Sequence, residues 1–543
     1  MKFESMVIPA MNDFASLYIE QKEPVRGFFH YDITENTVFE KRYQDVMNRK
    51  YNRADLAECI KAYMLKFPQS EQTKNSLKKL QLHNSSVVIG GQQAGLLTGP
   101  LYTIHKVISI IKLAEQQEKK LGAPVIPVFW IAGEDHDVLE VNHVYVEAGQ
   151  SMKKMSYQEV NVNEKRMTSD ISFNKDEMKK WIDSIFMHFG ERKYTKELLS
   201  FIDEVLQSSH TITDLFSCII MELFKDYGLL IMDAADPNIR KLEQSYFEQL
   251  INENTQITNA VLQQQEIITG HDFKKAIEID KDCANIFYYK NNERLLLNYD
   301  PLEDMFVEKK GNFQIERRFL LEELNSSPDK FSNNVVTRPV MQEFVFPSLA
   351  FIAGPGEIAY WGELKQVFEH LGIQMPPIIP RLNMTFVEAV VERDVNELEL
   401  DLNNVLKNGV NSSLQVFLDS ERDQELISKL DEIASYLKAE YNDIFSRLEE
   451  SDRGLLPLAK KNLNFHLLQL EFLERKSNFN MEQKFQATLD KYKKVERHLY
   501  PNGIPQERIW NIFYYLNEYG LSFIDQLMME NFEFDGKHKV IKI

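Results

Sequence analysis

The sequence predicts an α/β protein whose doubly wound parallel sheet is interrupted by insertions and followed by an α-helical antiparallel coiled coil. Three observations predict this fold class. Between residues 85 and about 381, short β-branched runs alternate with longer segments of helical period, as βα units require. The short runs lack polar alternation, which indicates strands buried on both faces. After Thr385 the pattern becomes helical only, and 543 residues are enough for two or three domains.

The predicted strands of the sheet are short apolar runs, each followed by a turn or a helix. Helices are predicted where apolar residues recur at spacings of three and four, and the first of them ends at Gly122, since glycine commonly terminates helices. The predicted strands cover residues 87–89, 124–131, 229–232, 349–353 and 377–380, and the predicted helices cover residues 101–121, 213–227 and 357–371.

Two parts of the sheet region do not follow the βα repeat, and we expect insertions there, around residues 150–212 and 260–335. Residues 152–172 are strand-like and polar. Residues 283–308 predict a β-hairpin that turns at Asn291 and Asn292. The predicted domains are a core of residues 1–384 with these insertions, a helical domain of residues 385–510, and a C-terminal segment of residues 511–543 that returns to the core.

The predicted helical domain carries apolar residues at coiled-coil spacings on two consecutive segments. Two long helices separated near residues 452–457 would form an antiparallel coiled-coil hairpin. An ordinary amphipathic helical domain is the alternative, because Glu440 and Arg447 interrupt the seam. An exposed apolar seam favours a homodimer. The apolar positions are Leu426, Leu430, Ile433, Leu437, Ile444 and Leu448, then Leu463, Leu467, Leu470, Met481, Phe485, Leu489 and Tyr492.

Composition restricts the partners and the compartment. The formal net charge of −19 argues against nucleic acid as a partner, because phosphate contact needs clustered lysine and arginine. Cys59, Cys218 and Cys283 are widely spaced and form no CxxC pair, which fits a reducing cytoplasm. No window reaches about 18 apolar residues and the N-terminus lacks the apolar stretch of a signal peptide, so we expect no membrane partner.

The first segment that could carry chemistry is GGQQAGLLTGPLYTIHK, residues 90–106, where a strand passes into a helix. Its glycines and small polar residues precede a helix N-terminus, which attracts anions such as phosphate or carboxylate. It matches neither the P-loop nor the GxGxxG fingerprint. We therefore predict that Gln92, Gly95 and Thr98 bind substrate, although the glycines could serve only a tight turn. His105 is a catalytic candidate or, alternatively, a hydrogen-bonded core histidine.

The second segment is GEDHDVLEVNH, residues 133–143, directly after the next predicted strand. Carboxylates and an imidazole at the carboxyl end of a strand would face the same crevice as the first loop. We predict His136, Asp135 and Asp137 to act in general acid–base catalysis. A metal held by Asp135, His136 and His143, or a solvated turn, are the alternatives. No metal site is predicted, because no HxH, HxxxH or HExxH spacing is present. Glu134, Asn142 and His143 are predicted to contact substrate.

The third segment is FIAGPGEIAYWGELK, residues 351–365, another passage from strand to helix. Gly354 permits close backbone approach in the turn, and Glu357, Tyr360 and Trp361 lie on the first helical turns. The two aromatic residues could stack on a flat ligand or belong to the core. Arg338 and Arg381 are cations able to bind a carboxylate or phosphate, although a surface ion pair is the usual alternative.

These three segments, with a coiled-coil C-terminus in a chain of this length, closely resemble the bacillithiol-biosynthesis cysteine-adding enzymes (cysteine ligases) of low-GC Gram-positive bacteria. The resemblance spans essentially the whole chain. It implies a Rossmann-like core related to nucleotidyltransferases and class I aminoacyl-tRNA synthetases, with connecting-peptide inserts, and a coiled-coil domain through which two chains dimerise. The implied reaction joins cysteine to glucosaminyl-malate through an amide bond, giving bacillithiol.

The chain departs from the wider synthetase pattern at both of its nucleotide motifs. Only the final histidine of an HxGH signature is present, as His105, and no KMSKS follows the last predicted strand. Amide formation from a free carboxylate nevertheless requires activation, so ATP or ADP is the expected co-substrate. A second nucleotide pocket is possible near residues 500–511, with Arg508 and Trp510 as its contacts, although packing at a domain junction is an equal alternative.

The expected mechanism assigns three roles. His136, with Asp135 or Asp137, removes a proton from the attacking amine, because amine attack needs the free base. Gly95, Thr98 and His105 hold the activated carboxyl group, and Arg338 or Arg381 binds the malate carboxylates. Two alternatives to the ligase are a non-catalytic dimeric adaptor that binds a small molecule and a nucleotidyltransferase that acts on another acid.

Overall fold

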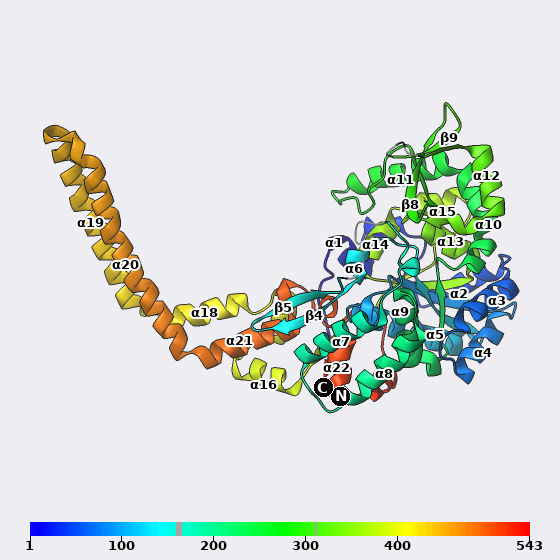
Figure 1. Cartoon of the computed structure of the whole chain (residues 1–543), viewed down its shortest axis with the longest axis horizontal. Coiled ribbons are helices and arrows are strands. Elements are labelled where there is room, and N and C mark those ends of the chain that lie inside the picture. The colour runs from blue at the N-terminus through cyan, green and yellow to red at the C-terminus, as the bar shows by residue number, and fades with distance from the viewer. Residues whose placement is uncertain (159–164, 310, 312) are drawn as a thin grey trace. The chain divides into compact units, whose positions relative to one another are not determined.

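The computed structural model describes residues 1–158, 165–309, 311 and 313–543 of the chain (Figure 1). It divides into two compact units. The first consists of residues 1–386 and 506–541, and the second of residues 387–505 and 542–543. The chain returns to the first unit at residue 506, whereas the sequence predicts that the helical domain ends at residue 510.

The first unit is built on a five-stranded parallel sheet in the order β13-β12-β2-β3-β6. In chain order this reads fifth, fourth, first, second, third, which is the doubly wound Rossmann order and confirms the predicted fold class. The strands are β2 (Ser86–Gln92), β3 (Val125–Ile131), β6 (Leu230–Asp233), β12 (Ser348–Ala353) and β13 (Ile378–Pro380).

The sheet is covered on both faces. All residues of β3 and of β12 are buried, and successive side chains in a strand point to opposite faces. Helix α5 (Tyr102–Leu121) packs on β2 and β3, and it ends at Gly122, whose left-handed φ of 61° only glycine adopts freely. The predicted helix 213–227 corresponds to α9 (Ile212–Phe224) and the short η4 (Lys225–Tyr227).

The predicted helix 357–371 is broken into α14 (Pro355–Gly362) and α15 (Lys365–His370). The first of these ends where Gly362 lies against an aromatic ring, since a Cβ there would be 2.6 Å from Cζ of Phe14. The next residue, Glu363, accepts hydrogen bonds from the backbone N–H of Ile277 and from Gln265. Tertiary contacts from distant segments therefore interrupt a locally helical sequence.

The first insertion lies between β3 and β6. It contains α6 (Val138–Val141), the antiparallel hairpin β4 (His143–Ala148) and β5 (Ser151–Ser156), η3 (Thr168–Asp170), α7 (Lys175–Phe189) and α8 (Thr195–Ser208). The strand expected over residues 152–172 is right only to Ser156. Residues 159–164 lie outside the described residues, and the described part that follows forms the 3-10 turn η3 because Asp170 N–H bonds back to Met167.

The second insertion lies between β6 and β12 and forms a separate antiparallel sheet in the order β10-β9-β8-β7-β11. The predicted hairpin is confirmed, because β7 and β8 pair across Asn291 and Asn292, whose φ values are 53° and 63°. The elements are α10 (Pro237–Asn252), α11 (Asn254–Thr269), β7 (Cys283–Lys290), β8 (Glu293–Asp300), β9 (Met305–Glu308), β10 (Gln314–Glu316), α12 (Arg317–Ser326), η5 (Pro328–Lys330), β11 (Phe331–Asn333) and α13 (Thr337–Val345).

Both ends of the chain complete the first unit. The N-terminal elements are β1 (Lys2–Met6), α1 (Asp13–Ile19), η1 (Val25–Phe28), α2 (Val38–Met47), α3 (Arg53–Met64) and α4 (Glu71–Leu80), and α2 and α3 pack on β12 and β6. The C-terminal elements are η8 (Gln506–Arg508), α22 (Ile512–Tyr519), α23 (Ser522–Met528) and β15 (His538–Lys542). The last of these lies between β1 and β14 (Met384–Val387) in a three-stranded sheet.

The second unit is helical. Its long helices α19 (Gln424–Ser451) and α20 (Leu456–Lys484) run side by side as a hairpin (Figure 1). The turn η6 (Arg453–Leu455) joins them where the sequence predicts the break, and the chain breaks again at Phe485. The other helices are α16 (Ala389–Glu397), α17 (Leu402–Asn408), α18 (Asn411–Glu421) and α21 (Gln486–Leu499). In the part of the chain that the structure describes, every helix is too short or too polar to span a bilayer.

Candidate active site

The carboxyl ends of the five parallel strands meet at one edge of the sheet, which is where ligands bind in open α/β proteins. The strand order reverses between β2 and β12, so the topological switch point lies between these neighbours. Glycine allows them to approach there, since a Cβ on Gly90 would lie 3.1 Å from the carbonyl oxygen of Ile352. The predicted loops after β2, β3 and β12 therefore converge on one edge.

Lys106 connects the two sides of the switch point. Its ammonium group donates to the carbonyl oxygen of Gly91 at 2.6 Å and to Oε2 of Glu357 at 2.5 Å. The same carboxylate oxygen accepts the backbone N–H of Gly354 at 2.7 Å. Burial lowers the pKa of Lys106, and Glu357 opposes that shift. The sequence predicted Glu357 and Gly354 as site residues but not Lys106. A lysine within an apolar helical run could have indicated it.

The loop after β2 folds against the C-terminal segment of the same unit. Leu97 and Thr98 are left-handed, with φ values of 49° and 72°, which is unusual for residues with a Cβ and indicates local strain. Asn511 holds this loop by donating from Nδ2 to the carbonyl oxygens of Leu97 and Gly99, both at 2.8 Å. Gly95 is required for packing, because a Cβ there would lie 2.8 Å from Cα of Gly99.

Two of the N–H groups at the N-terminus of α5, where an anion site is expected, already bond to carbonyl oxygens of the protein. The N–H of Leu101 bonds to the carbonyl oxygen of Trp510 at 2.8 Å, and that of Thr103 bonds to Pro100 at 3.0 Å. Gly95 and Thr98 are buried in this loop, and their predicted contact with substrate stays a prediction. Gln92, at the end of β2, is half-buried and remains at the edge.

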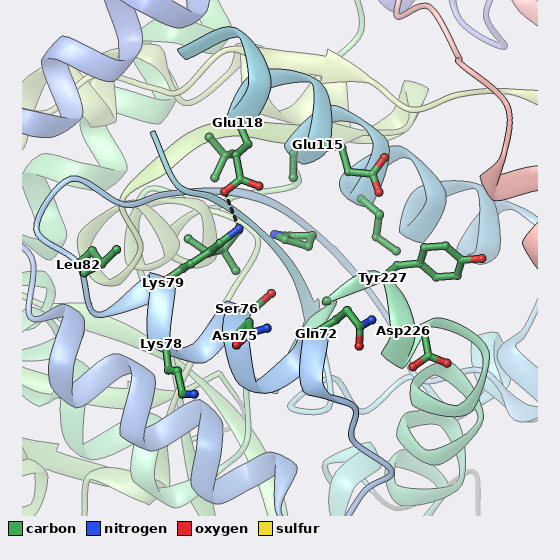
Figure 2. A pocket seen from close by; sticks show the side chains of 16 residues that line it. Gln72, Asn75, Ser76, Lys78, Lys79, Leu82, Glu115, Glu118, Asp226 and Tyr227 are labelled. Carbon is green, nitrogen blue, oxygen red and sulfur yellow. Dashed lines mark hydrogen bonds and ion pairs between the residues drawn. The ribbon is translucent and has the colours of Figure 1, made fainter. Parts of the chain in front are cut away.

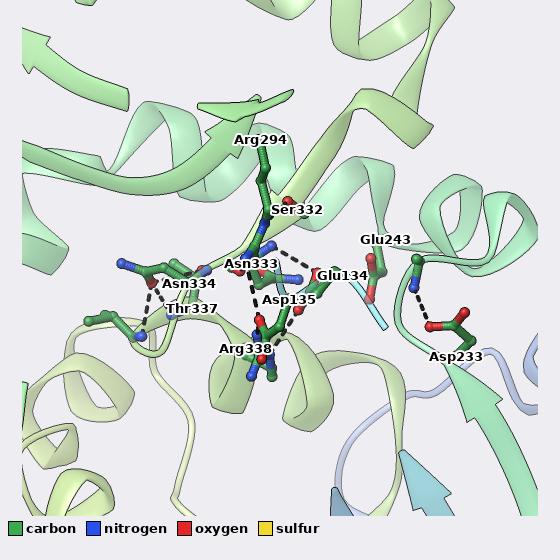
Figure 3. Close-up of polar contacts among 12 residues, drawn as sticks. Glu134, Asp135, Asp233, Glu243, Arg294, Ser332, Asn333, Asn334, Thr337 and Arg338 are labelled. Atoms are coloured by element: carbon green, nitrogen blue, oxygen red, sulfur yellow. Dashed lines mark hydrogen bonds and ion pairs between the residues drawn. The ribbon is translucent and has the colours of Figure 1, made fainter. Parts of the chain in front are cut away.

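A network of carboxylates and arginines follows β3 (Figure 3). Glu134 is fully buried and pairs with Arg240 and with Nε of Arg338, the latter at 2.8 Å. Asp135 pairs with Arg338 and, at 3.3 Å, with Arg294. Burial by itself would raise the pKa of Glu134, but the three arginines lower it to about 2. The network is therefore a set of ionised groups that fixes the position of this loop.

The same network bears on the role predicted for Arg338, which stays a prediction. Its guanidinium group is already shared between Glu134 and Asp135, so its charge is largely offset before any ligand binds. Arg338 and Asp135 keep 22% and 20% of their side chains exposed, whereas Glu134 exposes none, so only the first two can touch a ligand. Arg240 and Arg294 come from α10 and β8, and nothing in the local sequence links them to Glu134.

His136 lies at the exposed end of this network. It is half-buried, and its ring centroid lies 6.0 Å from that of Phe287. Burial, Arg294 and Lys165 lower the pKa of His136, although Asp135 and Asp137 oppose the shift. The imidazole is therefore neutral near pH 7 and can accept a proton, as a general base must.

The remaining residues of the second segment lie around α6 and the β4–β5 hairpin. Asp137 is exposed directly before α6. Asn142 is buried, and its carbonyl oxygen accepts the N–H of Tyr157 at 2.8 Å. His143 begins β4, and burial together with Lys154 lowers its pKa to about 4. Asn142 therefore supports the hairpin, while Asp137 and His143 keep exposed surface.

Two predicted residues form an interior ion-pair group. His105 is fully buried with Nδ1 3.4 Å from Oε2 of Glu507, and burial lowers its pKa. Arg381 is 5% exposed and donates to Oε1 of Glu507 at 2.5 Å. Burial alone would raise the pKa of Glu507, but Arg381 and His105 lower it to about 2. His105 and Arg381 therefore both lie in the interior and pair with Glu507, and their substrate contacts stay predictions.

The aromatic candidates divide in the same way. Trp361 is buried with its ring centroid 4.6 Å from that of Phe351, and Trp510 is buried with its ring centroid 4.2 Å from that of Tyr514. Both therefore pack in the core, which was the alternative to ligand stacking. Tyr360 is half-buried. Arg508 is exposed, with its guanidinium carbon 5.7 Å from the centre of the Tyr102 ring.

The remaining features that bear on a site are metal-ligating clusters and cavities. Among the described residues, no group of three or more His, Cys, Asp and Glu side chains could hold a metal ion. A cavity of about 550 Å³ lies at the amino ends of the strands, lined by Val125 of β3 and by Gly228, with the Lys79–Glu118 ion pair at its rim (Figure 2). It was not predicted from the sequence, and it lies at the opposite edge of the sheet from the switch point.

The strand order of the parallel sheet and the loops at its carboxyl edge define a Rossmann-like α/β protein with a helical second unit. Residues 1–382 match the model of the bacillithiol biosynthesis BshC N-terminal Rossmann-like domain, and residues 384–543 match the BshC C-terminal coiled-coil domain. The chain therefore belongs to the BshC family of bacillithiol biosynthesis.

Curated relatives agree over the full length of the chain. A protein of Geobacillus sp. (strain WCH70) is 42% identical, and one of Geobacillus thermodenitrificans (strain NG80-2) is 41% identical. A protein of Bacillus thuringiensis (strain Al Hakam) is 39% identical. Each alignment covers 100% of this chain and 100% of the relative, and each relative is named "Putative cysteine ligase BshC".

Proposed function

We propose that this protein is a ligase that joins the carboxyl group of cysteine to the amine of glucosaminyl-malate, giving bacillithiol. The observation that carries the proposal is membership of the BshC family over the whole chain, including both domains. The carboxyl edge of the sheet supplies a place for the reaction, because it carries a neutral imidazole, a partly exposed carboxylate and a partly exposed cation.

The residues that the proposal places against substrate are those at the edge with exposed surface. His136, with Asp135 or Asp137, is the proposed base for the attacking amine. Arg338 offers a guanidinium edge to a malate carboxylate, in exchange for part of its bonding to Asp135. The others are Gln92, Gly354, Glu357 and Tyr360. His105, Arg381, Trp361 and Trp510 are left out because they are buried.

Activation of the cysteine carboxylate is part of the proposal. An amide does not form from a free carboxylate at neutral pH without an energy source, so ATP is the proposed co-substrate, with ADP bound as its product. The exposed Arg508 remains a candidate phosphate contact, whereas buried Trp510 does not fit a stacking role. The cytoplasm is the proposed location, where the three unpaired cysteines stay reduced.

A homodimer is proposed through the second unit. Every residue of α20 keeps exposed surface, and Leu458, Phe465, Phe472 and Phe479 recur every seven residues with 63%, 54%, 48% and 52% of their surface exposed. A heptad of exposed apolar side chains on a hairpin is the pattern by which coiled coils associate. A second copy of the same hairpin would cover this stripe.

Bacillithiol formation by the purified protein tests the proposal directly. We expect mass spectrometry to detect the product when cysteine, glucosaminyl-malate and ATP are present, and to detect none when cysteine is left out. Omitting ATP tests the activation step separately. Absence of bacillithiol with all three substrates and a folded protein would refute the ligase.

A further inference from the structure

The Lys106–Glu357 ion pair presents its carboxylate, and not its ammonium group, to the carboxyl edge of the sheet. The side chain of Lys106 is 2% exposed and that of Glu357 is 22% exposed. Both donors to the carboxylate, Lys106 Nζ and the N–H of Gly354, use Oε2. No described group donates to Oε1, although each carboxylate oxygen accepts about two hydrogen bonds.

The position of this free oxygen is fixed by the local fold. Glu357 is the third residue of α14, and its side chain caps the helix by accepting the N–H of Gly354. Lys106 restrains the same carboxylate from the other side of the switch point. The carboxylate is therefore held in one orientation before a ligand arrives, which reduces the entropy lost on binding.

Tyr360 lies three residues after Glu357 on α14, so the two side chains leave the same side of the helix. Burial and then Glu357 raise the pKa of the Tyr360 phenol, while Arg338 opposes the shift, so both charges act on the same ring. A carboxylate oxygen next to an aromatic ring is a pair of groups that binds ammonium ions.

We propose that Oε1 of Glu357, with the ring of Tyr360 beside it, binds a primary ammonium group of a substrate. The inference rests on the proposed function, which supplies two sources for that group: the α-ammonium of cysteine and the amine of glucosaminyl-malate in its protonated form. Lys106 acts as a positioning residue, because it fixes the carboxylate without reaching the edge itself.

Matched ligand pairs test the site by binding alone. The first pair is L-cysteine and 3-mercaptopropionate, which lacks only the ammonium group, and the second is glucosaminyl-malate and glucosyl-malate, which has a hydroxyl in place of the amine. Calorimetry on the wild-type protein measures the dissociation constants of both members of each pair. In one pair we expect the member without the amine to bind roughly 10-fold more weakly, because a hydrogen bond to a charged group contributes about that much binding free energy. That pair identifies the source.

Glu357→Gln is the decisive variant, because it keeps the shape of the side chain and removes its charge. We expect the ratio of dissociation constants within the responding pair to fall to within about 2-fold. Glu115→Gln, which changes a Lys–Glu pair elsewhere in the fold, is the matched control and should keep the wild-type ratio. Tyr360→Leu, with the carboxylate intact, should lower the ratio only in part.

The inference and the proposed function fail in different ways. An unchanged ratio in Glu357→Gln for both pairs, or equal binding of both members of each pair by the wild type, overturns the ammonium site even if bacillithiol is formed. A collapsed ratio in a protein that makes no bacillithiol supports the ammonium site and overturns the ligase.

Discussion

Asn511 donates a hydrogen bond of 2.8 Å from Nδ2 to the carbonyl oxygen of Leu97, although 414 residues separate them. The same amide group bonds to Gly99, and its Oδ1 accepts the N–H of Phe513 at the start of α22. A single buried side chain thus caps a helix and holds the strained loop after β2. The segment that the sequence reasoning considered as a nucleotide pocket therefore fixes a loop at the edge of the sheet.

Replacing Asn511 with aspartate is expected to release this loop. The carboxylate can still cap α22, but it would face two carbonyl oxygens without a proton to donate, and the loss of two buried hydrogen bonds costs about 2–3 kcal/mol. Hydrogen exchange should rise in residues 95–101. The control is Asn517→Asp, because Asn517 is also buried on α22 and holds Gly190 at 2.9 Å. Equal exchange in both variants would contradict the role of Asn511.

The pH dependence of turnover tests His136. Burial, Arg294 and Lys165 lower its pKa below the ordinary 6.5, so the imidazole loses its proton as pH rises and is already neutral at pH 7. We expect kcat to rise with pH on an acidic limb below pH 6.5 and to level above it. His136→Gln should lose this limb and about 10²- to 10⁴-fold in kcat. The exposed His188, changed to Gln, should leave both unchanged.

These assignments separate what the sequence predicts from what it does not. The strands, the end of α5 at Gly122 and the turn at Asn291 follow from local patterns, because periodicity and left-handed residues act within a few positions. The ion pairs of Glu134 and Asp135 do not, since their partners come from α10, β8 and α13. The local sequence does not show whether a histidine lies at the edge of the sheet or in the interior. His105 is fully buried and His136 is half-buried, although both were predicted to be catalytic.

The interior group around His538 predicts a loss of stability in mild acid. His538 is buried against Thr385, with Nε2 2.8 Å from Oγ1, and burial is the main cause that lowers its pKa to about 4. Between pH 6.5 and 4 the unfolded chain binds a proton that the folded chain does not. The contribution of His538 to the free energy of unfolding is therefore complete above pH 6.5. It is lost as pH falls towards 4, by up to about 3 kcal/mol.

His538→Gln is expected to remove that part of the pH dependence. Urea unfolding of the wild type and the variant should give free energies whose difference changes between about pH 7 and pH 4, with the wild type losing more. The exposed His188→Gln provides the comparison, because it removes a histidine from the surface and leaves the interior around His538 unchanged. A constant difference between wild type and His538→Gln over this range would contradict the lowered pKa, because folded and unfolded chains would then bind the proton equally.

The heptad stripe on α20 predicts the oligomeric state. Phe465 and Phe472 expose about half of their surface, and two such hairpins packed together would bury it at roughly 25 cal/mol per Å². Changing both residues to glutamate places like charges along the same stripe. Light scattering should therefore give twice the chain mass for the wild type and the single mass for the variant.

Two comparisons separate loss of the dimer from loss of the hairpin. Leu430, which α19 buries, is left intact in the double variant, so circular dichroism should show unchanged helicity. Asn464→Glu with Asn478→Glu adds the same two charges one position before Phe465 and Phe479 without removing apolar surface, and this control should remain dimeric. A wild type of single mass at micromolar concentration would contradict the dimer, because a stripe of this exposure would then remain in water.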